Sequence, residues 1–143
     1  RRKDPRMQID KLKHQHADIL ARLAALRQLT HAGVAPNAPA IAAGIVGMSA
    51  VIKLHLAVED QALYPALQRS HDADMAHMGQ LYQDEMAQLA EAYDGFVRRW
   101  NTAQRLRADT EGFRADANDV LRRLHARMQR ENREFYPRIE ALA

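Results

Sequence analysis

Apolar residues recur at every third or fourth position along almost the whole chain, and this spacing constrains the fold more than any other feature. It gathers apolar side chains on one face of an α-helix, and the alternation typical of strands is nearly absent. Three stretches interrupt the pattern: Gly33 to Pro39, Ser70 to Asp72, and Asp109–Thr110. The sequence predicts four helices between these breaks, over about residues 5–32, 38–70, 72–108 and 110–141.

Long helices joined by short turns pack as antiparallel neighbours. We therefore predict an all-α fold, an up-down antiparallel four-helix bundle. A chain of 143 residues has the length of one domain, so we expect a single domain over residues 1–143. The longest apolar run, AIAAGIVGM at residues 40–48, is too short to cross a membrane, and no signal peptide is recognised. We expect a cytoplasmic protein with no membrane partner.

Composition excludes several kinds of chemistry. The chain has no cysteine, which rules out disulfides, cysteine-bound zinc, iron–sulfur clusters and thiol catalysis. Any metal must therefore bind His, Asp or Glu. The net charge is only +3 and the arginines are scattered among acidic residues, so we expect no nucleic-acid partner. Neither a glycine-rich phosphate loop nor a nucleophile turn is present.

Polar residues break into the apolar seams of all four predicted helices. Burying such groups is costly unless they are paired or bind a metal, so several of them need a common cause. Five residues interrupt the seams outright: His16, His55, Glu59, Glu85 and Glu131. Arg127 flanks the fourth seam, and Tyr82 lies on the inward face of the third.

Position along the bundle groups these residues. In antiparallel neighbours, residues equally far from the connecting turn lie at the same height. His16 and His55 are nearly equidistant from the turn near residue 35, and Glu85 pairs in the same way with Glu59 and with Glu131. We therefore predict one polar layer. The remaining histidines are expected on the surface or near turns: His14, His31, His71, His77 and His125.

The predicted layer has the composition of a metal site. His55 and Glu59 are four residues apart on one helical face, and imidazole with carboxylate suits iron, manganese or zinc. Three glutamates against one arginine leave a charge of about −2, which one divalent ion would neutralise. The alternative is a metal-free network in which Arg127 pairs with the glutamates and the histidines bind Glu59. Tyr82 is either a hydrogen-bond donor behind the ligands or a core aromatic.

One phrase occurs twice. Residues 55–65 read HLAVEDQALYP and residues 127–137 read RMQRENREFYP, with Arg127 at the position of His55. On an α-helix, Tyr64 and Tyr136 would point about 140° away from the glutamate of the same phrase. We therefore expect both tyrosines between helices or at the rim of the bundle. The proline that follows each tyrosine should bend or end its helix about a turn later.

At these residues the chain resembles the hemerythrin-like family, also called HHE cation-binding domains. The resemblance rests on His16 with Ile19, on the second-helix phrase from His55 through Glu59-Asp60 to Tyr64-Pro65, and on Glu131 with Tyr136-Pro137. It implies a four-helix bundle with a non-heme di-iron centre. Members of the family bind oxygen, respond to oxygen, nitric oxide or redox state, or handle iron.

Two positions depart from the family pattern. The fourth helix of the family usually supplies a histidine where this chain has Arg127, and the third usually supplies a histidine where we expect Glu85. A guanidinium cannot bind a metal, so Arg127 is expected to occupy part of a second metal site. It would pair with Glu131, with Glu85 or with a small anion. Reversible oxygen transport is therefore not expected.

The sequence leads to one main hypothesis and two alternatives. The main hypothesis is a metal-binding sensor or regulatory domain holding mono- or dinuclear non-heme iron, or zinc or manganese, on the five residues above. It would take a small diatomic or anionic ligand at the metal, act without being an enzyme, and pair with a protein partner or a second copy. The alternatives are a metal-free helical interaction module and a small carboxylate-bridged oxidase or peroxidase.

Overall fold

A computed structural model describes residues 5–141 of the chain, with side chains from residue 9 onward. All regular secondary structure in this part is helical, which confirms the predicted all-α class. The helices are α1 (Pro5–Ala32), α2 (Ala38–Val58), α3 (Tyr64–Gln68), α4 (Ala73–Trp100), α5 (Ala103–Ala108), α6 (Thr110–Arg130) and α7 (Tyr136–Glu140). Two π-helical turns join neighbouring α-helices: η1 (Glu59–Leu63) and η2 (Glu131–Phe135).

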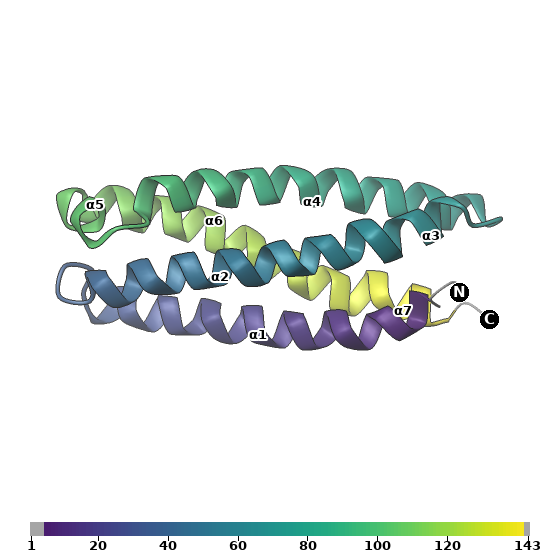
Figure 1. The fold of residues 1–143 in the computed structure, drawn as a ribbon, viewed down its shortest axis with the longest axis horizontal. Coiled ribbons are helices and arrows are strands. Elements are labelled where there is room, and N and C mark those ends of the chain that lie inside the picture. The colour runs from purple at the N-terminus through teal and green to yellow at the C-terminus, as the bar shows by residue number, and fades with distance from the viewer. Residues whose placement is uncertain (1–4, 142–143) are drawn as a thin grey trace.

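The helices form long rods that lie side by side (Figure 1). The second rod is α2, η1 and α3 in sequence, and the last is α6, η2 and α7. α1 packs on α2, α2 on α4, α4 on α6, and α6 back on α1, so the rods surround a common interior. Both chain ends lie at one end of this arrangement, and α5 lies at the other. The arrangement is consistent with the expected bundle, although the helices are more divided than predicted.

The predicted helix over 72–108 is wrong at its C-terminal end. α4 ends at Trp100, and α5 begins at Ala103 after a two-residue break. The Thr102 side chain accepts a hydrogen bond from the backbone N–H of Arg105 at 3.2 Å, which makes it the N-cap of a new helix. The apolar spacing continues through this break, so spacing alone did not reveal it.

Other helix ends follow the predicted signals. Asp72 caps α4 by accepting from the N–H groups of Asp74 and Met75, and Asp109 caps α6 by accepting from Gly112. Gly33 follows α1 with φ of 128°, a left-handed conformation that favours glycine. These residues set the lengths of the rods and therefore the heights of the side chains along them.

Each copy of the repeated phrase contains a π-helical turn. In η1 the Tyr64 N–H bonds to the Glu59 carbonyl, five residues back, and in η2 the Tyr136 N–H bonds in the same way to Glu131. A proline follows each tyrosine, and proline lacks the N–H for an α-helical bond and clashes with the carbonyl four residues back. One extra residue in the preceding turn relieves this conflict. Glutamate and tyrosine are thereby separated by roughly one turn and share a face.

The buried apolar residues form two clusters with a polar layer between them. One cluster runs toward α5 and includes Ile19, Met86 and Leu124, and the other runs toward the chain ends and includes Leu12, Leu63 and Phe135. His16 lies on α1 between Leu12 and Ile19. The apolar clusters therefore enclose the polar layer along the axis of the bundle.

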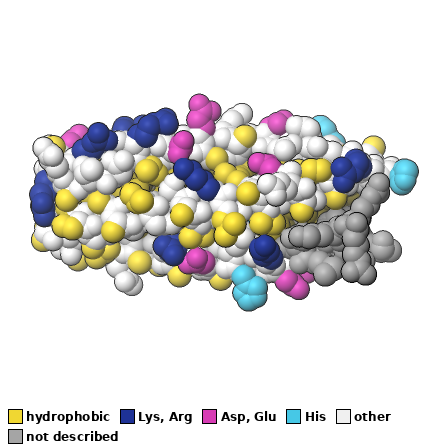
Figure 2. Space-filling view, in the orientation of Figure 1, with side chains coloured by type: hydrophobic (Ala, Val, Ile, Leu, Met, Phe, Trp, Pro, Cys, Tyr) yellow, Lys and Arg dark blue, Asp and Glu magenta, His cyan; other side chains and the backbone are white. Residues whose placement is uncertain are grey.

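The rod from Ala38 to Gln68 is long and apolar enough to span a membrane, by length and composition only. The unbroken apolar run at residues 40–48 is shorter than the apolar part of this rod, because the helix continues through further apolar residues such as Ile52 and Leu54. One third of its most apolar window is buried. On the face in Figure 2, apolar side chains are spread among charged ones. The rod also carries His55 and Glu59 into the interior.

Candidate metal centre

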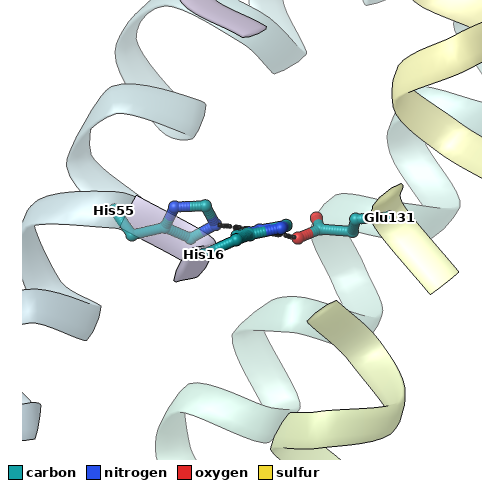
Figure 3. Close-up of side chains that lie close together, drawn as sticks. All are labelled: His16, His55 and Glu131. Carbon is teal, nitrogen blue, oxygen red and sulfur yellow. Dashed lines mark hydrogen bonds and ion pairs between the residues drawn. The ribbon is translucent and has the colours of Figure 1, made fainter. Parts of the chain in front are cut away.

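Three side chains of types that can bind a metal meet in the polar layer (Figure 3). His16 comes from α1, His55 from α2, and Glu131 from the start of η2, and each is at most 1% exposed. Nε2 of His16 lies 3.2 Å from Nε2 of His55 and 2.9 Å from Oε1 of Glu131. Nε2 of His55 lies 3.6 Å from the same Glu131 oxygen. Three helical rods thus contribute one donor atom each to a single point.

Amide side chains fix the orientation of both imidazoles. Nδ1 of His16 lies 2.9 Å from Oδ1 of Asn132, and Nδ1 of His55 lies 2.9 Å from Oε1 of Gln15. An amide oxygen only accepts hydrogen bonds, so Nδ1 of each ring carries the proton. Burial lowers the pKa of His55, which keeps that ring neutral near pH 7. On a neutral ring with its proton on Nδ1, the Nε2 atom carries a lone pair, and both Nε2 atoms face each other and Glu131, as in metal-binding histidines.

The donor set fits a transition-metal ion. Three lone-pair atoms this close repel one another unless a proton or a metal cation lies between them. Two ligand atoms that share one ion at about 2.1 Å are separated by roughly 2.9–3.4 Å. Two of the three separations here, 2.9 and 3.2 Å, are in that range, and the third is slightly longer at 3.6 Å. Two imidazoles and a carboxylate are ligands that iron, zinc and manganese accept.

The two glutamates of the layer differ in protonation although both are completely buried. Burial opposes the ionisation of Glu131, but the charge of Arg127, with Nη2 3.3 Å from Oε2, favours the carboxylate, and the pKa of Glu131 lies below its usual range. Burial and the charge of Glu131 raise the pKa of Glu59 well above its usual range. Glu131 is therefore the ionised donor. The raised pKa of Glu59 favours its neutral form, and its Oε1 lies 3.4 Å from Nε2 of His55.

A comparison with known families agrees with this geometry. The family model described as hemerythrin HHE cation binding domain matches residues 7–139. The chain belongs to this family. No curated protein and no solved structure is significantly similar to it. The matched region contains every residue of the polar layer, and the family description names cation binding as its property.

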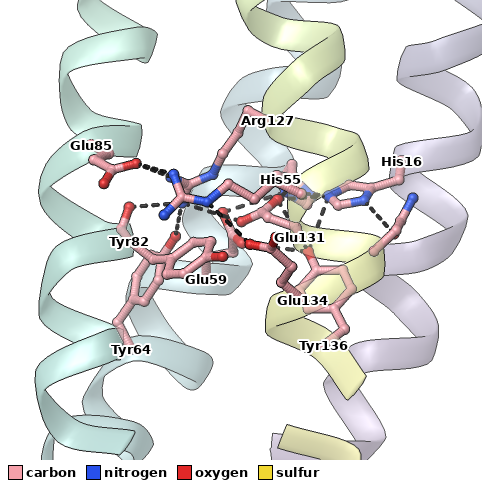
Figure 4. A network of polar contacts seen from close by, with 12 residues as sticks. His16, His55, Glu59, Tyr64, Tyr82, Glu85, Arg127, Glu131, Glu134 and Tyr136 are labelled. Atoms are coloured by element: carbon pink, nitrogen blue, oxygen red, sulfur yellow. Dashed lines mark hydrogen bonds and ion pairs between the residues drawn. The ribbon is translucent and has the colours of Figure 1, made fainter. Parts of the chain in front are cut away.

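Arg127 is the main departure of this hemerythrin-like chain from the family pattern. Its side chain is 5% exposed, and Nη2 lies 3.3 Å from Oε2 of Glu131 (Figure 4). Nη2 also donates to the backbone carbonyl of Tyr82 at 2.7 Å and to the Tyr64 hydroxyl at 3.3 Å. The guanidinium therefore neutralises Glu131 from the side opposite the histidines. It places a fixed positive charge beside the donor atoms.

The prediction that Glu85 lies in the buried layer is wrong. Its side chain is 47% exposed, and it pairs with Arg127 at 3.5 Å and with Arg130 at 2.7 Å. The buried positions of α4 near this height are Tyr82, Met86 and Leu89. The step from Tyr82 to the next inward residue is four and not three, so Met86 occupies the place assigned to Glu85. The layer therefore holds two glutamates.

Tyr82 contacts the Arg127 side chain through both its ring and its backbone carbonyl. The ring stacks on Phe135 with centroids 4.0 Å apart, and the guanidinium carbons of Arg127 and Arg130 lie 4.5 and 4.7 Å from its centroid. Such cation–π contacts favour the charged guanidinium. Of the two roles expected for Tyr82, the structure agrees with the core aromatic. Its ring and its carbonyl also hold the Arg127 guanidinium in place.

Tyr136 and Tyr64 reach the polar layer, contrary to the prediction that they point away from it. The Tyr136 hydroxyl lies 3.0 Å from Nε2 of His16 and 3.5 Å from oxygens of Glu59 and Glu131. The Tyr64 hydroxyl contacts Arg127. The 140° estimate assumed an unbroken α-helix, and the π turns bring each tyrosine back to the face of its glutamate. The repeated Glu-to-Tyr-Pro spacing was the signal that could have revealed this.

The remaining histidines lie away from the donors, as predicted. His14, His31, His71 and His77 are exposed, and His125 is half-buried. Gln15 and Asn132, which orient the imidazoles, were not among the predicted residues. Each is adjacent in sequence to a donor, and nothing in the apolar spacing distinguishes such a neighbour from a surface amide.

Proposed function

We propose that this hemerythrin-like domain binds one non-heme iron on His16, His55 and Glu131 and acts as a sensor or regulatory domain. The observation that carries the proposal is the convergence of two Nε2 lone pairs and one ionised carboxylate within a completely buried layer. Glu59, whose Oε1 has no hydrogen-bond partner among the described residues, is the fourth group within reach. Zinc and manganese are the other metals that this donor set accepts.

The charges support one metal ion in preference to two. Glu131 and Arg127 already form a neutral pair, and the raised pKa of Glu59 favours its neutral form in the absence of a metal. A second cation on the Arg127 side would lie close to the guanidinium charge and would be repelled. The histidine that the family usually places there is absent. The site is therefore expected to hold one metal ion.

The location of the site supports sensing rather than turnover of a large substrate. Donors that are at most 1% exposed admit only small ligands, such as oxygen, nitric oxide or a small anion. Bound iron supplies a redox-active, ligand-binding centre at this point. The chain's own residues connect it to the fold, because the donors lie on three different rods and two π turns flank them. A change at the metal would alter the packing of these rods.

Anaerobic loading with Fe(II), followed by nitric oxide or air, tests this function. We expect a new absorption band and changed hydrogen exchange in η1 and η2, with little change near α5. His55→Ala should lose both responses, and His14→Ala, an exposed histidine on α1, should keep them. Iron that binds without any change in hydrogen exchange on exposure to either gas would contradict the sensor role.

One observation favours a metal-free interaction module instead. Arg127 already balances the charge of Glu131, so the layer carries no net charge when Glu59 is protonated. Such a network can be retained for structure alone. The two functions differ in metal uptake. A full chain that takes up neither iron nor zinc on reconstitution, yet stays folded, would support the module and exclude the sensor.

A further inference from the structure

A cavity of about 340 Å³ lies between α4 and α6, on the outer side of Arg127. Its walls include three arginines, Arg123, Arg127 and Arg130, against a single carboxylate, Glu85. Gln88 and the buried side chain of Leu89 also line this cavity. The volume is within the range of small-ligand pockets, and the excess of guanidinium groups favours an anion.

Arg127, which lines this cavity, has unused hydrogen-bond donors buried behind the cavity wall. Its side chain is 95% buried, given an exposure of 5%. Nη2 is satisfied by Tyr82 and Tyr64, whereas Nε and Nη1 have no hydrogen-bond partner among the described residues. Buried donors of a charged group normally have a hydrogen-bond partner. An incoming oxygen atom would therefore accept hydrogen bonds from these two N–H groups.

The contacts of the Glu85 carboxylate indicate the kind of ligand that the cavity can bind. Its Oε2 lies 2.7 Å from Nη1 of Arg130 and 3.5 Å from Nη1 of Arg127, so one carboxylate oxygen is shared by two guanidinium groups. The contact to Arg127 is long, and the Glu85 side chain is 47% exposed. An incoming anion can therefore displace it into solvent. Among the described residues, the ion pair of Arg123 is a 3.9 Å contact to Asp119 on its own helix.

We propose that this cavity binds a small divalent oxoanion of the phosphate class on Arg127 and Arg130, with Arg123 at the rim, in place of Glu85. A dianion matches three guanidinium groups better than the single charge of Glu85. Guanidinium groups donate parallel hydrogen bonds to such oxygens. The anion would satisfy Nε and Nη1 of Arg127, which the long Glu85 contact leaves unsatisfied.

The same arginine connects the cavity to the metal centre. Nη2 of Arg127 lies 3.3 Å from Oε2 of Glu131, so its charge opposes a cation bound at Glu131. An anion at the cavity would neutralise that charge and favour metal binding. Coupling between two sites is reciprocal, so metal would also strengthen anion binding. This regulatory step rests on the proposed metal-binding function, whereas anion binding itself does not.

Titration calorimetry of the full chain with inorganic phosphate, first without metal, tests the cavity. We expect saturable binding that is roughly tenfold weaker in Arg130→Gln and in Arg123→Gln, the loss typical of one charge-assisted contact. Binding should be stronger in Glu85→Gln, because the internal competitor is removed. The matched control is Arg122→Gln, which removes the same charge from the neighbouring position of α6 and lies outside this cavity.

Several results would overturn the proposal. Absence of saturable phosphate binding in both wild type and Glu85→Gln would remove the site. An equal loss of phosphate affinity in Arg122→Gln would mean that phosphate binding reflects only the overall charge of the protein. Acetate that binds as tightly as phosphate would contradict the preference for a dianion.

The regulatory step is tested separately by repeating the metal titration with and without phosphate. We expect metal affinity to rise at least about fivefold with phosphate present, and unchanged affinity would overturn the coupling. Arg127 itself is not used in this test, because its substitution would alter both sites. Phosphate binding to a chain that takes up no metal would sink the proposed metal function and leave the anion site intact.

Discussion

Glu131 and Glu59 are equally buried, but only Glu131 forms an ion pair with the Arg127 guanidinium. The pKa of Glu131 is held low and it stays ionised, while the pKa of Glu59 is raised. The residue that carries charge in the layer is thus determined by its neighbours and not by its depth. Sequence placed both glutamates correctly in the layer but could not distinguish them.

Replacing Glu131 should cost far more stability than replacing Glu59. Glu131→Gln leaves the buried Arg127 without its carboxylate partner, and breaking such a pair typically costs roughly 3–5 kcal/mol. Glu59→Gln replaces a protonated acid by a similar neutral group and should cost about 1 kcal/mol or less. Chemical denaturation of the metal-free protein measures both. Equal losses would mean that the two glutamates share the charge.

Arg127→His should raise the number of metal ions per chain. The change removes the buried positive charge and provides an imidazole four residues before Glu131, the arrangement that His55 and Glu59 already have. We expect about two metal ions per chain in this variant, measured by elemental analysis after reconstitution with iron. A count that stays at the wild-type value would show that Arg127 does not occupy a second site.

At the scale of elements, most of the fold followed from apolar spacing, and the failures have specific causes. The spacing located the rods, and the aspartates located the starts of α4 and α6. It missed the break before Ala103 because apolar residues continue through it. The spacing also assigned Glu85 to the buried face of α4, where the structure has Met86, because steps of three and of four residues are equally compatible with a helix. It also assumed α-helical geometry through both π turns.

The prolines should maintain the π turns. Pro137→Ala restores an N–H and removes the clash with the preceding turn, so η2 can relax into an α-helix and carry Tyr136 away from His16. Because contacts behind metal ligands typically contribute 10- to 100-fold, we expect metal affinity to fall by about that factor. A metal titration measures this. Pro39→Ala, at the exposed start of α2, is the control and should leave affinity unchanged.

At the scale of the whole molecule, we expect the proposed metal binding to be coupled to folding. The donors belong to α1, α2 and η2, which come together only in the folded chain. An ion that binds only the folded state stabilises it by about 2.7 kcal/mol at a concentration 100 times its dissociation constant. A chelator should therefore lower the free energy of unfolding by about that amount. Tyr93→Phe should not affect this difference, because Tyr93 bonds to the Ile45 carbonyl within the apolar cluster toward α5.

The most direct test of the central claim is the metal content of the full chain, measured by elemental analysis after growth with iron and zinc and after reconstitution. The variants compared are wild type, His55→Ala, and His14→Ala as the control. The account predicts close to one metal ion per chain in wild type and His14→Ala, and none in His55→Ala. No metal uptake by the folded wild-type chain would contradict the claim that these donors form a metal centre.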